Sequence, residues 1–257
     1  MSTYKEFLKK KKKEKRFILF FQFIIIIFIL SLWEILSKLN LINTFLSSSP
    51  SNILDTFIKL IKDNNFFPHL WVTLYEIIIS FSITCFIGFI IASIMWYFPK
   101  FAKIIDPYLT ILNSLPKVAL GPLIIIWIGA NTKSIIFMSL LISCFITIIN
   151  VYNGFISVDK YYITLLKSFG ASRLQIFYKL IVPGSKSSLI NSIKINISMS
   201  LIGCIMGELL VSKKGLGYLI MYGSQVFNIN LVITSVVILG ILSYIMYEIV
   251  AIIEKNS

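Results

Sequence analysis

Residues 5–36 read KEFLKKKKKEKRFILFFQFIIIIFILSLWEIL, a basic block followed directly by an apolar run. Eight of the 24 Lys and Arg residues lie between Lys5 and Arg16, and the apolar run extends from Phe17 to Leu36. About 20 apolar residues are enough to cross a bilayer as a helix. Cationic residues before a first span predict a cytoplasmic N-terminus. A signal peptide begins in the same way, but this run is long for one and no small-x-small cleavage pattern follows, so we expect an uncleaved span.

The rest of the chain has the same apolar character. Hydrophobic residues make up 57% of the 257 positions and charged residues 14%, whereas soluble domains average about 45–50% and about 25%. A chain in lipid must satisfy its own backbone hydrogen bonds, so only helices and closed barrels span a bilayer. The apolar runs are continuous rather than alternating, which predicts an all-α membrane protein. The net charge of +13 comes in good part from the block before the first run, so we expect no nucleic-acid partner.

We predict about six spans, near residues 17–36, 70–97, 107–129, 133–150, 187–211 and 229–251. With the N-terminus inside, most Lys and Arg residues of the connecting segments fall on the cytoplasmic side, so both termini are expected to be cytoplasmic. The more polar segment 37–69 contains a predicted helix from Asn52 to Lys62, capped by Asn or Ser. His69, the only histidine, is expected to be a polar anchor without a chemical role. The three cysteines are expected to be small buried hydrophobic residues.

The third apolar run is irregular, because Pro107, Pro116 and Pro122 each lack a backbone donor and Gly121 adds freedom. Broken helices are tolerated in membranes where neighbouring groups satisfy the freed carbonyls, and they often line a pathway. The alternative is a short in-plane helix from Pro107, a break, and an ordinary span from about Lys117. The two descriptions are compatible with each other.

Residues 151–186 are too polar to span the membrane, yet their apolar residues recur at roughly helical spacing on both sides of a central turn. Gly170 can end a helix in the left-handed conformation, Ser172 can cap the next helix, and Pro183 closes the second half. We therefore predict a cytoplasmic helix–turn–helix with an apolar face. Such a face either lies on the lipid surface or docks into a groove of a partner.

This segment resembles the cytoplasmic EAA loop of binding-protein-dependent ABC importer permeases. The shared residues are Gly170-Ala171-Ser172 and, about a dozen positions later, Pro183. Likeness to the nitrate/sulfonate/taurine branch covers about residues 45–225 and is carried by Ser49-Pro50-Ser51, Asp106-Pro107-Tyr108, Leu115-Pro116, Ala119-Leu120-Gly121-Pro122-Leu123, Trp127-Ile128-Gly129, Glu208 and Gly215-Leu216-Gly217-Tyr218. Two features depart from the pattern: Thr164-Leu165-Leu166 replaces the usual Glu-Ala-Ala, and Glu76 stands where the family often has Arg.

The resemblance implies a type I ABC importer permease (MetI-like) bundle in the bacterial inner membrane. It implies a basic cytoplasmic tail at 1–16 and a permease domain at 17–257 with its core at 70–251. The implied partners are two cytoplasmic ABC ATPase subunits, a second permease copy in a homodimer, an extracytoplasmic substrate-binding protein and membrane lipid. The loop at 151–186 would couple the ATPase to the spans through Thr164, Leu165, Leu166, Phe169, Gly170, Ala171, Ser172 and Pro183. Of these, Leu166 and Phe169 are the expected apolar anchors. The alternative is that these residues only pack the loop against its own bundle.

The sequence contains no Gly-x-x-x-x-Gly-Lys-Ser/Thr loop for ATP phosphates, and no triad, carboxylate pair or metal-ligand spacing in a plausible site. We therefore expect no catalysis, metal or cofactor on this chain, with ATP bound by the partner subunit. Charged residues within spans are functional candidates by default. The candidates for the translocation pathway are Pro116, Lys117, Lys194 and Glu208. Lys194 can equally snorkel to the interface, and Glu208 is expected either to gate the pathway or to pack against the Gly-Leu-Gly-Tyr turn. Gly203 and Gly207 form a small-xxx-small pair that we expect to pack helices within the subunit rather than between subunits.

Three other functions are weighed against the importer permease. An ion-gradient-driven secondary transporter more often shows inverted repeats and mid-span carboxylates, and neither is visible here. A membrane-embedded enzyme needs a catalytic constellation, which is missing. A non-transporting scaffold is the third alternative, and copurification with an ATPase separates it from the importer. The resembling branch handles nitrate, alkanesulfonates, taurine and, in close relatives, pyrimidine precursors of thiamine, and its binding proteins set most of the specificity.

Overall fold

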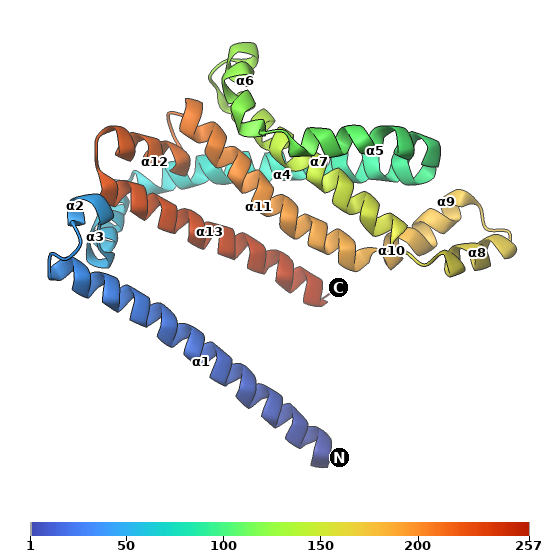
Figure 1. Cartoon of the computed structure of the whole chain (residues 1–257), viewed down its shortest axis with the longest axis horizontal. Helices are drawn as coiled ribbons and strands as arrows, with labels where there is room; N and C mark the ends of the chain where they lie inside the picture. The colour runs from blue at the N-terminus through green and yellow to red at the C-terminus, as the bar shows by residue number, and fades with distance from the viewer. Residues whose placement is uncertain (1, 257) are drawn as a thin grey trace.

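The structure, a computed structural model, describes residues 2–256, and over that range it contains helices and no strands. Long helices run roughly along one axis, and most of the short helices gather at its two ends (Figure 1). Among these residues, up to six segments could cross a membrane if one bent helix pair counts as a span, and five of them are single helices that are long and apolar enough. They are α1 (Ser2–Lys38), α4 (Phe66–Tyr97), α7 (Thr132–Ile156), α11 (Lys186–Val211) and α13 (Ile229–Asn256). The all-α membrane class predicted from the sequence is confirmed.

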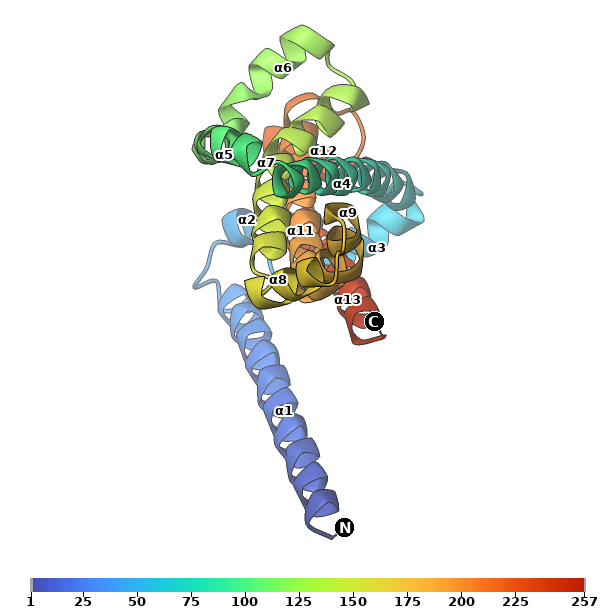
Figure 2. The same cartoon turned by 90° about the vertical axis from the view of Figure 1, so that its right-hand side faces the viewer.

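Helix α1 stands apart from the bundle. It leaves the other helices at its C-terminal end and extends alone (Figure 2), and no residue of its most apolar window is buried. Its attachment is polar, because the carboxylate of Glu34 accepts the N–H of Ser51 at 3.1 Å and its hydroxyl at 2.7 Å. Ser51 lies in the first turn of α3 (Pro50–Lys62), which Ser49 caps by accepting the N–H of Asn52. The predicted helix at 52–62 is therefore confirmed and begins two residues earlier.

The third predicted span is not one helix. It consists of α5 (Pro99–Ser114), the 3-10 turn η1 (Lys117–Leu120) and α6 (Gly121–Ile128), and the chain bends by 81° between α5 and η1. The predicted break in this run is confirmed, whereas the alternative of an in-plane helix followed by an ordinary span is wrong. No helix begins at Pro107, which lies inside α5. No ordinary span follows Lys117, because the eight residues of α6 reach only about 12 Å of the about 30 Å needed.

Except for α6, which projects from the side of the bundle, the short helices lie at its opposite ends (Figure 1). At one end are α2 (Thr44–Ser47), α3 and α12 (Leu216–Gln225), and at the other are α8 (Lys160–Ser168) and α9 (Arg173–Ile176). Both chain termini point toward the α8–α9 end. From α9 the chain continues through a π-helical turn, η2 (Phe177–Ile181), and α10 (Val182–Gly184) into α11. The expectation that Pro183 closes the second half of the loop is wrong, because helical structure continues past it to Gly184.

Helices α4, α7 and α11 form the centre of the bundle, and small residues let them approach closely. A Cβ on Gly203 would lie 2.5 Å from Cα of Ser139, and a Cβ on Gly207 would lie 2.9 Å from Cα of Ile135. The hydroxyl of Ser139 donates to the carbonyl of Ser200 at 2.9 Å. Close approach and interhelical hydrogen bonds are how membrane helices associate. The small-xxx-small pair on α11 therefore packs against α7 of the same chain, as predicted.

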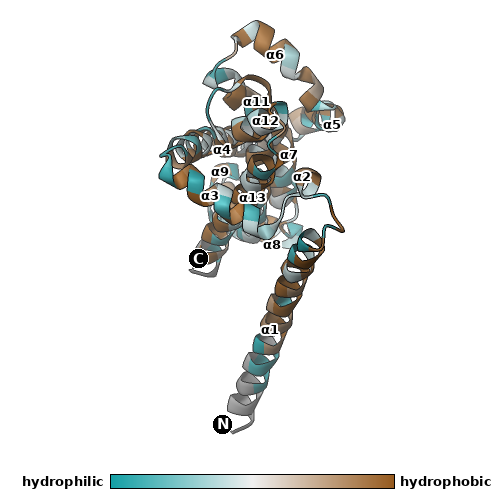
Figure 3. Cartoon of the chain, turned by 90° about the vertical axis from the view of Figure 1, so that its left-hand side faces the viewer, coloured by the Kyte–Doolittle hydropathy of each residue, from teal (hydrophilic) through white to brown (hydrophobic). Residues whose placement is uncertain are grey.

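Hydrophobic residues run along much of α1 (Figure 3), and large hydrophobic side chains are exposed on the other long helices as well. Large side chains such as Phe86 and Trp71 are 68% and 72% exposed. Apolar exposure on this scale is unfavourable in water and is the normal condition of a surface in lipid. The cysteines have the structural role expected of them: Cys204 is buried in the core, while Cys85 and Cys144 are half-buried, and all three are free thiols.

Candidate functional site

The turn between α8 and α9 is built by the residues that the sequence singled out. Gly170 adopts φ +77°, and its N–H donates to the carbonyl of Lys167 at 3.0 Å. The N–H of Ala171 donates to the carbonyl of Leu166, also at 3.0 Å. This pair of bonds is the Schellman motif, which ends a helix at a left-handed glycine. The predicted glycine stop is confirmed.

The start of α9 is fixed by side-chain hydrogen bonds between Ser172 and Gln175. The hydroxyl of Ser172 accepts the N–H of Gln175 at 3.3 Å, and the side-chain oxygen of Gln175 accepts the N–H of Ser172 at 2.8 Å. This reciprocal arrangement is a capping box, and it confirms the predicted cap at Ser172. Gly170, Ala171 and Ser172 together fix the angle between α8 and α9.

The α8–α9 segment has an inner and an outer apolar side. Leu166 and Ala171 lie on the inner side, packed against a buried cluster that includes Phe155 and Ile176. On the outer side, Phe169 is 77% exposed, and Leu165 and Leu174 are also exposed. Leu166 and Phe169, which the sequence grouped as anchors, thus face different surroundings. Phe169 is available to a partner, whereas Leu166 holds the segment to its own bundle.

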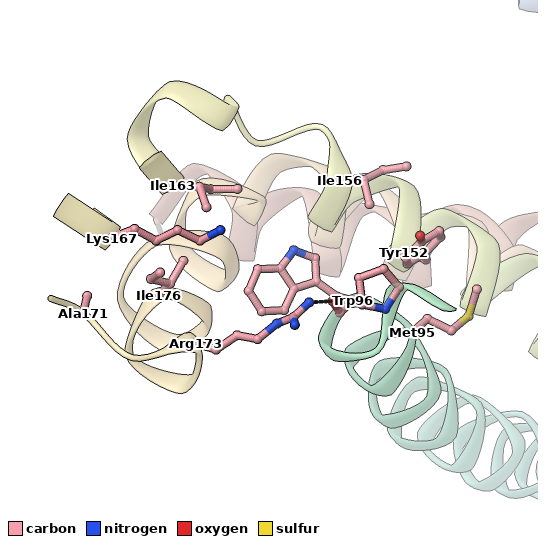
Figure 4. Close-up of a pocket in the computed structure, with 10 residues that line it drawn as sticks. Met95, Trp96, Tyr152, Ile156, Ile163, Lys167, Ala171, Arg173 and Ile176 are labelled. Atoms are coloured by element: carbon pink, nitrogen blue, oxygen red, sulfur yellow. Dashed lines mark hydrogen bonds between the residues drawn. The ribbon is translucent and has the colours of Figure 1, made fainter. Parts of the chain in front are cut away.

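A second attachment joins this segment to the end of α4. The guanidinium of Arg173 donates from Nη2 to the carbonyl oxygen of Trp96 at 3.3 Å. Its central carbon lies 5.6 Å from the ring centroid of Trp96 and 5.2 Å from that of Tyr97, within the range of cation–π attraction. Figure 4 shows Arg173 reaching from α9 to Trp96. Neither residue belongs to a motif that is recognisable in the sequence.

The opposite end of the bundle carries a polar cluster around the start of α12. Three consecutive backbone N–H groups, those of Gly215, Leu216 and Gly217, each have a side-chain acceptor. The acceptors are Nδ1 of His69 at 2.9 Å, Oγ1 of Thr73 at 2.8 Å and Oε2 of Glu208 at 2.6 Å. The first N–H groups of a helix have no partner within the helix, so His69, Thr73 and Glu208 supply it. We call these three residues the α12 clasp.

The clasp is itself cross-linked and closely fitted. Thr73 Oγ1 donates to Oε1 of Glu208 at 2.6 Å, while the His69 ring stacks on that of Tyr218 at 5.7 Å. Gly215 adopts φ +119°, and a Cβ on it would overlap the Glu208 carboxylate. Glu208, a pathway candidate from the sequence, therefore binds the Gly-Leu-Gly-Tyr turn. His69, for which the sequence predicted no chemical role, is part of the same structure.

Glu76 lies beside the clasp and was flagged in the sequence only as a departure from the family pattern. It is fully buried, next to Glu208 on α11 and Thr132 at the start of α7. Among the described residues, neither of its carboxyl oxygens has a hydrogen-bond partner. His69, Thr73 and Glu76 are spaced by four and three residues, so they share one face of α4. That spacing was visible in the sequence and could have grouped them.

The remaining pathway candidates lie apart from one another. Pro116 is at the bend between α5 and η1. The ammonium of Lys117 donates to the carbonyl and side-chain oxygens of Asn113, at 2.9 and 3.1 Å. Lys194 forms an ion pair of 2.6 Å with Glu254 on α13. The structure therefore does not gather Pro116, Lys117, Lys194 and Glu208 into one site, and among the described residues no group of three or more His, Cys, Asp or Glu is placed to hold a metal ion.

The fold has known counterparts. Two inward-facing structures of the MetNI methionine ABC transporter are similar to it, with TM-scores of 0.66 and 0.62 at 19% and 20% sequence identity. The first match covers 73% of this chain and 94% of the other, and the second covers 74% and 98%. The chain therefore shares the fold of these membrane-spanning structures. Residues 84–256 match the family described as binding-protein-dependent transport system inner membrane component, and the chain belongs to that family.

Several proteins that are similar to this chain in sequence are named as transport permeases. The formylaminopyrimidine transport permease protein ThiX of Halalkalibacterium halodurans is 29% identical over 73% of this chain and 74% of its own length. The putative aliphatic sulfonates transport permease protein SsuC of Bacillus subtilis is 25% identical, over 89% and 83%. The taurine transport system permease protein TauC of Escherichia coli is 22% identical, over 85% and 81%. The chain is therefore a permease subunit of an ABC importer and a multi-pass inner-membrane protein.

Proposed function

We propose that the α8–α9 segment is the docking site for a cytoplasmic ABC ATPase, which binds the ATP that drives transport. One observation supports this more than any other: the segment is fixed to the bundle on its inner side, while Phe169, Leu165 and Leu174 remain exposed on its outer side. Exposed apolar side chains on a rigid element are suited to a groove on a partner. Thr164-Leu165-Leu166 stands where the resembling family usually has Glu-Ala-Ala. Of these three, Leu165 lies on the exposed side with Phe169 and Leu174, so the proposed contact is apolar.

The proposed coupling passes through the two attachments of this segment. Movement of α9 would reach α4 through Arg173 and Trp96, and it would reach α11 through the helical continuation at η2 and α10. Because α4 and α11 meet again at the α12 clasp, the same rigid-body movement would be felt at the far end of the bundle. Pro116 and Lys117, at the 81° bend, are then the candidates for a flexible part of the pathway wall.

The proposed orientation places the α8–α9 end in the cytoplasm. Both termini point toward this end (Figure 1), as do the basic block at 5–16 and the basic residues Lys160, Lys167, Arg173 and Lys179. An excess of Lys and Arg marks the cytoplasmic side of a membrane protein. The proposed domain division follows the predicted one: a basic tail at 1–16 and a permease domain at 17–257.

The proposed assembly contains two copies of this chain, two ATPase subunits and an extracytoplasmic binding protein. The family description names a binding-protein-dependent system, which supports the last of these partners. For the substrate we propose a small solute such as an aliphatic sulfonate, taurine or a formylaminopyrimidine, because relatives over most of the chain carry these names. The binding protein, rather than this chain, would make most of that choice.

The ATPase docking proposal is tested with Phe169→Ser, measured as copurification of the ATPase and as substrate-stimulated ATP hydrolysis in proteoliposomes. Burial of a phenylalanine side chain stabilises a contact by about 1.5–3 kcal/mol, so we expect ATPase affinity to fall by about tenfold or more. Phe45→Ser is the matched control, since Phe45 is 60% exposed at the opposite end of the bundle. Equal ATPase binding and stimulation in both variants would overturn the proposal.

A further inference from the structure

A cavity of about 410 Å³ lies between the α8–α9 segment and the ends of α4 and α7. It is distinct from the outer apolar side of the segment, because it opens on the side where the segment meets the spans (Figure 4). We call it the Trp96 cavity. Its lining residues are Met95, Trp96, Pro99, Tyr152, Ile156, Ile163, Lys167, Ala171, Arg173 and Ile176.

The charged residues in this lining are both cations. Lys167 and Arg173 line the cavity and no acidic residue does. Two ion pairs are found among the described residues, Lys38–Glu34 and Lys194–Glu254, and neither involves these cations. A guanidinium has five N–H donors and an ammonium has three. Arg173 uses one N–H on the carbonyl of Trp96, so most donors of the pair are left for an anion.

The cavity also lies at a defined level of the membrane. The spanning helix α4 ends at Tyr97 and α7 ends at Ile156, so the cavity is next to the ends of two spans. Tryptophan and tyrosine concentrate at this level, where the headgroups of lipids begin. Trp96 and Tyr152 contribute such rings, and Ile156, Ile163 and Ile176 add apolar surface. The two cations of the lining are complementary to the phosphate group of a lipid, and its apolar side chains are complementary to the acyl chains.

We propose that the Trp96 cavity binds the phosphate headgroup of an anionic membrane lipid. The planar fork of Arg173 suits phosphate oxygens, and Lys167 supplies a second, point-like charge. Basic pockets between spanning helices on the cytoplasmic side are typical headgroup sites. A lipid bound here contacts α8 through Lys167, α9 through Arg173 and α4 through Trp96, and so reinforces the attachment of the segment to the bundle. The cytoplasmic placement rests on the proposed function; the lipid binding itself does not.

The experiment is native mass spectrometry of the purified full-length chain with phosphatidylglycerol, phosphatidylcholine or inorganic phosphate added. We expect wild type to retain phosphatidylglycerol over phosphatidylcholine, and Lys167→Gln/Arg173→Gln to lower that retention by about tenfold or more, a loss equivalent to about 1.4 kcal/mol. Lys133→Gln, at the start of α7, is the matched control and should retain lipid as wild type does. Arg173→Lys keeps the charge without the fork, and we expect intermediate retention.

Several results would overturn the lipid site. Equal retention of phosphatidylcholine would show that the cations do not select a charge. Displacement of the lipid by millimolar inorganic phosphate would identify a site for the free anion. Loss of the lipid on adding the ATPase subunit would assign Lys167 and Arg173 to the protein contact. Unchanged retention in both Lys167→Gln/Arg173→Gln and Arg173→Lys would place the lipid elsewhere. Lipid retention is measured without ATP hydrolysis. The lipid proposal can therefore be overturned while the ATPase docking proposal, tested with Phe169→Ser, stands, and the reverse also holds.

Discussion

The Glu208 carboxylate accepts the backbone N–H of Gly217 at 2.6 Å, which ties the C-terminal end of α11 to the first turn of α12. Thr73 on α4 binds the same carboxylate at 2.6 Å and also accepts the N–H of Leu216. One buried carboxylate therefore joins three helices at a single point. Movement of α4 relative to α11 must either carry α12 along or break these bonds.

Glu208→Gln is expected to weaken this junction. Glu208 is 1% exposed, and both of its oxygens accept hydrogen bonds, from Thr73 and Gly217. An amide offers one oxygen and places an NH₂ donor against an existing donor, so at least one charge-assisted bond is lost. Such bonds contribute about 1.5–3 kcal/mol. We expect a lower midpoint of thermal unfolding in detergent and slower transport; a midpoint equal to wild type would contradict the role of the carboxylate.

Glu76→Gln is expected to have the opposite effect on stability. Glu76 is fully buried next to Glu208, and its oxygens have no hydrogen-bond partner among the described residues. Burial and an adjacent carboxyl group both oppose ionisation of Glu76, so a neutral side chain is already favoured at this position. The amide keeps the size and can donate a hydrogen bond to Glu208. The unfolding midpoint should equal or exceed that of wild type, and a drop as large as that of Glu208→Gln would show that the acid itself is needed.

The local structure of the loop could be predicted because it depends on neighbouring residues. Gly170 and Ser172 end one helix and start the next through bonds that span three to five positions. The spans were predictable for a similar reason, since length and composition decide whether a helix can cross a bilayer. The close packing at Gly203 and Gly207 was predictable as well, because only small residues let two helices approach so closely.

The α12 clasp could not be assembled from the sequence, because its parts are far apart along the chain. His69 and Gly215 are separated by 146 residues, and nothing in a single sequence pairs them. The bend at Leu115–Pro116 was likewise ambiguous among three prolines. Pro107 lies inside α5 without interrupting it, so proline content alone did not locate the break. Arg173 was missed because a cation near a turn is ordinarily solvated, and its partner Trp96 lies on another helix.

Gly170→Ala is expected to destabilise the α8–α9 turn through the backbone alone. At φ +77° a Cβ would meet no atom within 4 Å, so the cost is the left-handed conformation itself, about 1–2 kcal/mol. Gly240→Ala is the matched control, because Gly240 lies within α13 with open space around it and alanine favours helices by about 1 kcal/mol. Substrate-stimulated ATP hydrolysis should fall in the first variant only.

Gly170→Pro extends the same test to complete loss of the turn. Proline fixes φ near −65° and removes the N–H that bonds to the carbonyl of Lys167. We expect the chain to remain in the membrane while substrate uptake is abolished. Uptake that survives this change, with ATP hydrolysis still stimulated by substrate, would show that the segment does not couple the two.

Lys194 and Glu254 distinguish a role in the pathway from a role in packing. The 2.6 Å ion pair joins α11 to α13, and the Lys194 ammonium also lies 5.3 Å from the ring centroid of Tyr247. If Lys194 serves only to hold α13, Lys194→Gln and Glu254→Gln should have equal and small effects, with uptake within about twofold of wild type, because an ion pair whose carboxylate is 41% exposed contributes little. The Lys194→Glu/Glu254→Lys exchange should then restore wild-type behaviour.

If Lys194 instead attracts an anionic substrate, Lys194→Gln should raise the KM for uptake while Glu254→Gln should not. In that case the exchanged pair should transport an anion worse than either single variant. Uptake kinetics in proteoliposomes, measured for all four proteins at low and high salt, separate these outcomes, because attraction by an exposed charge weakens as the Debye length shortens.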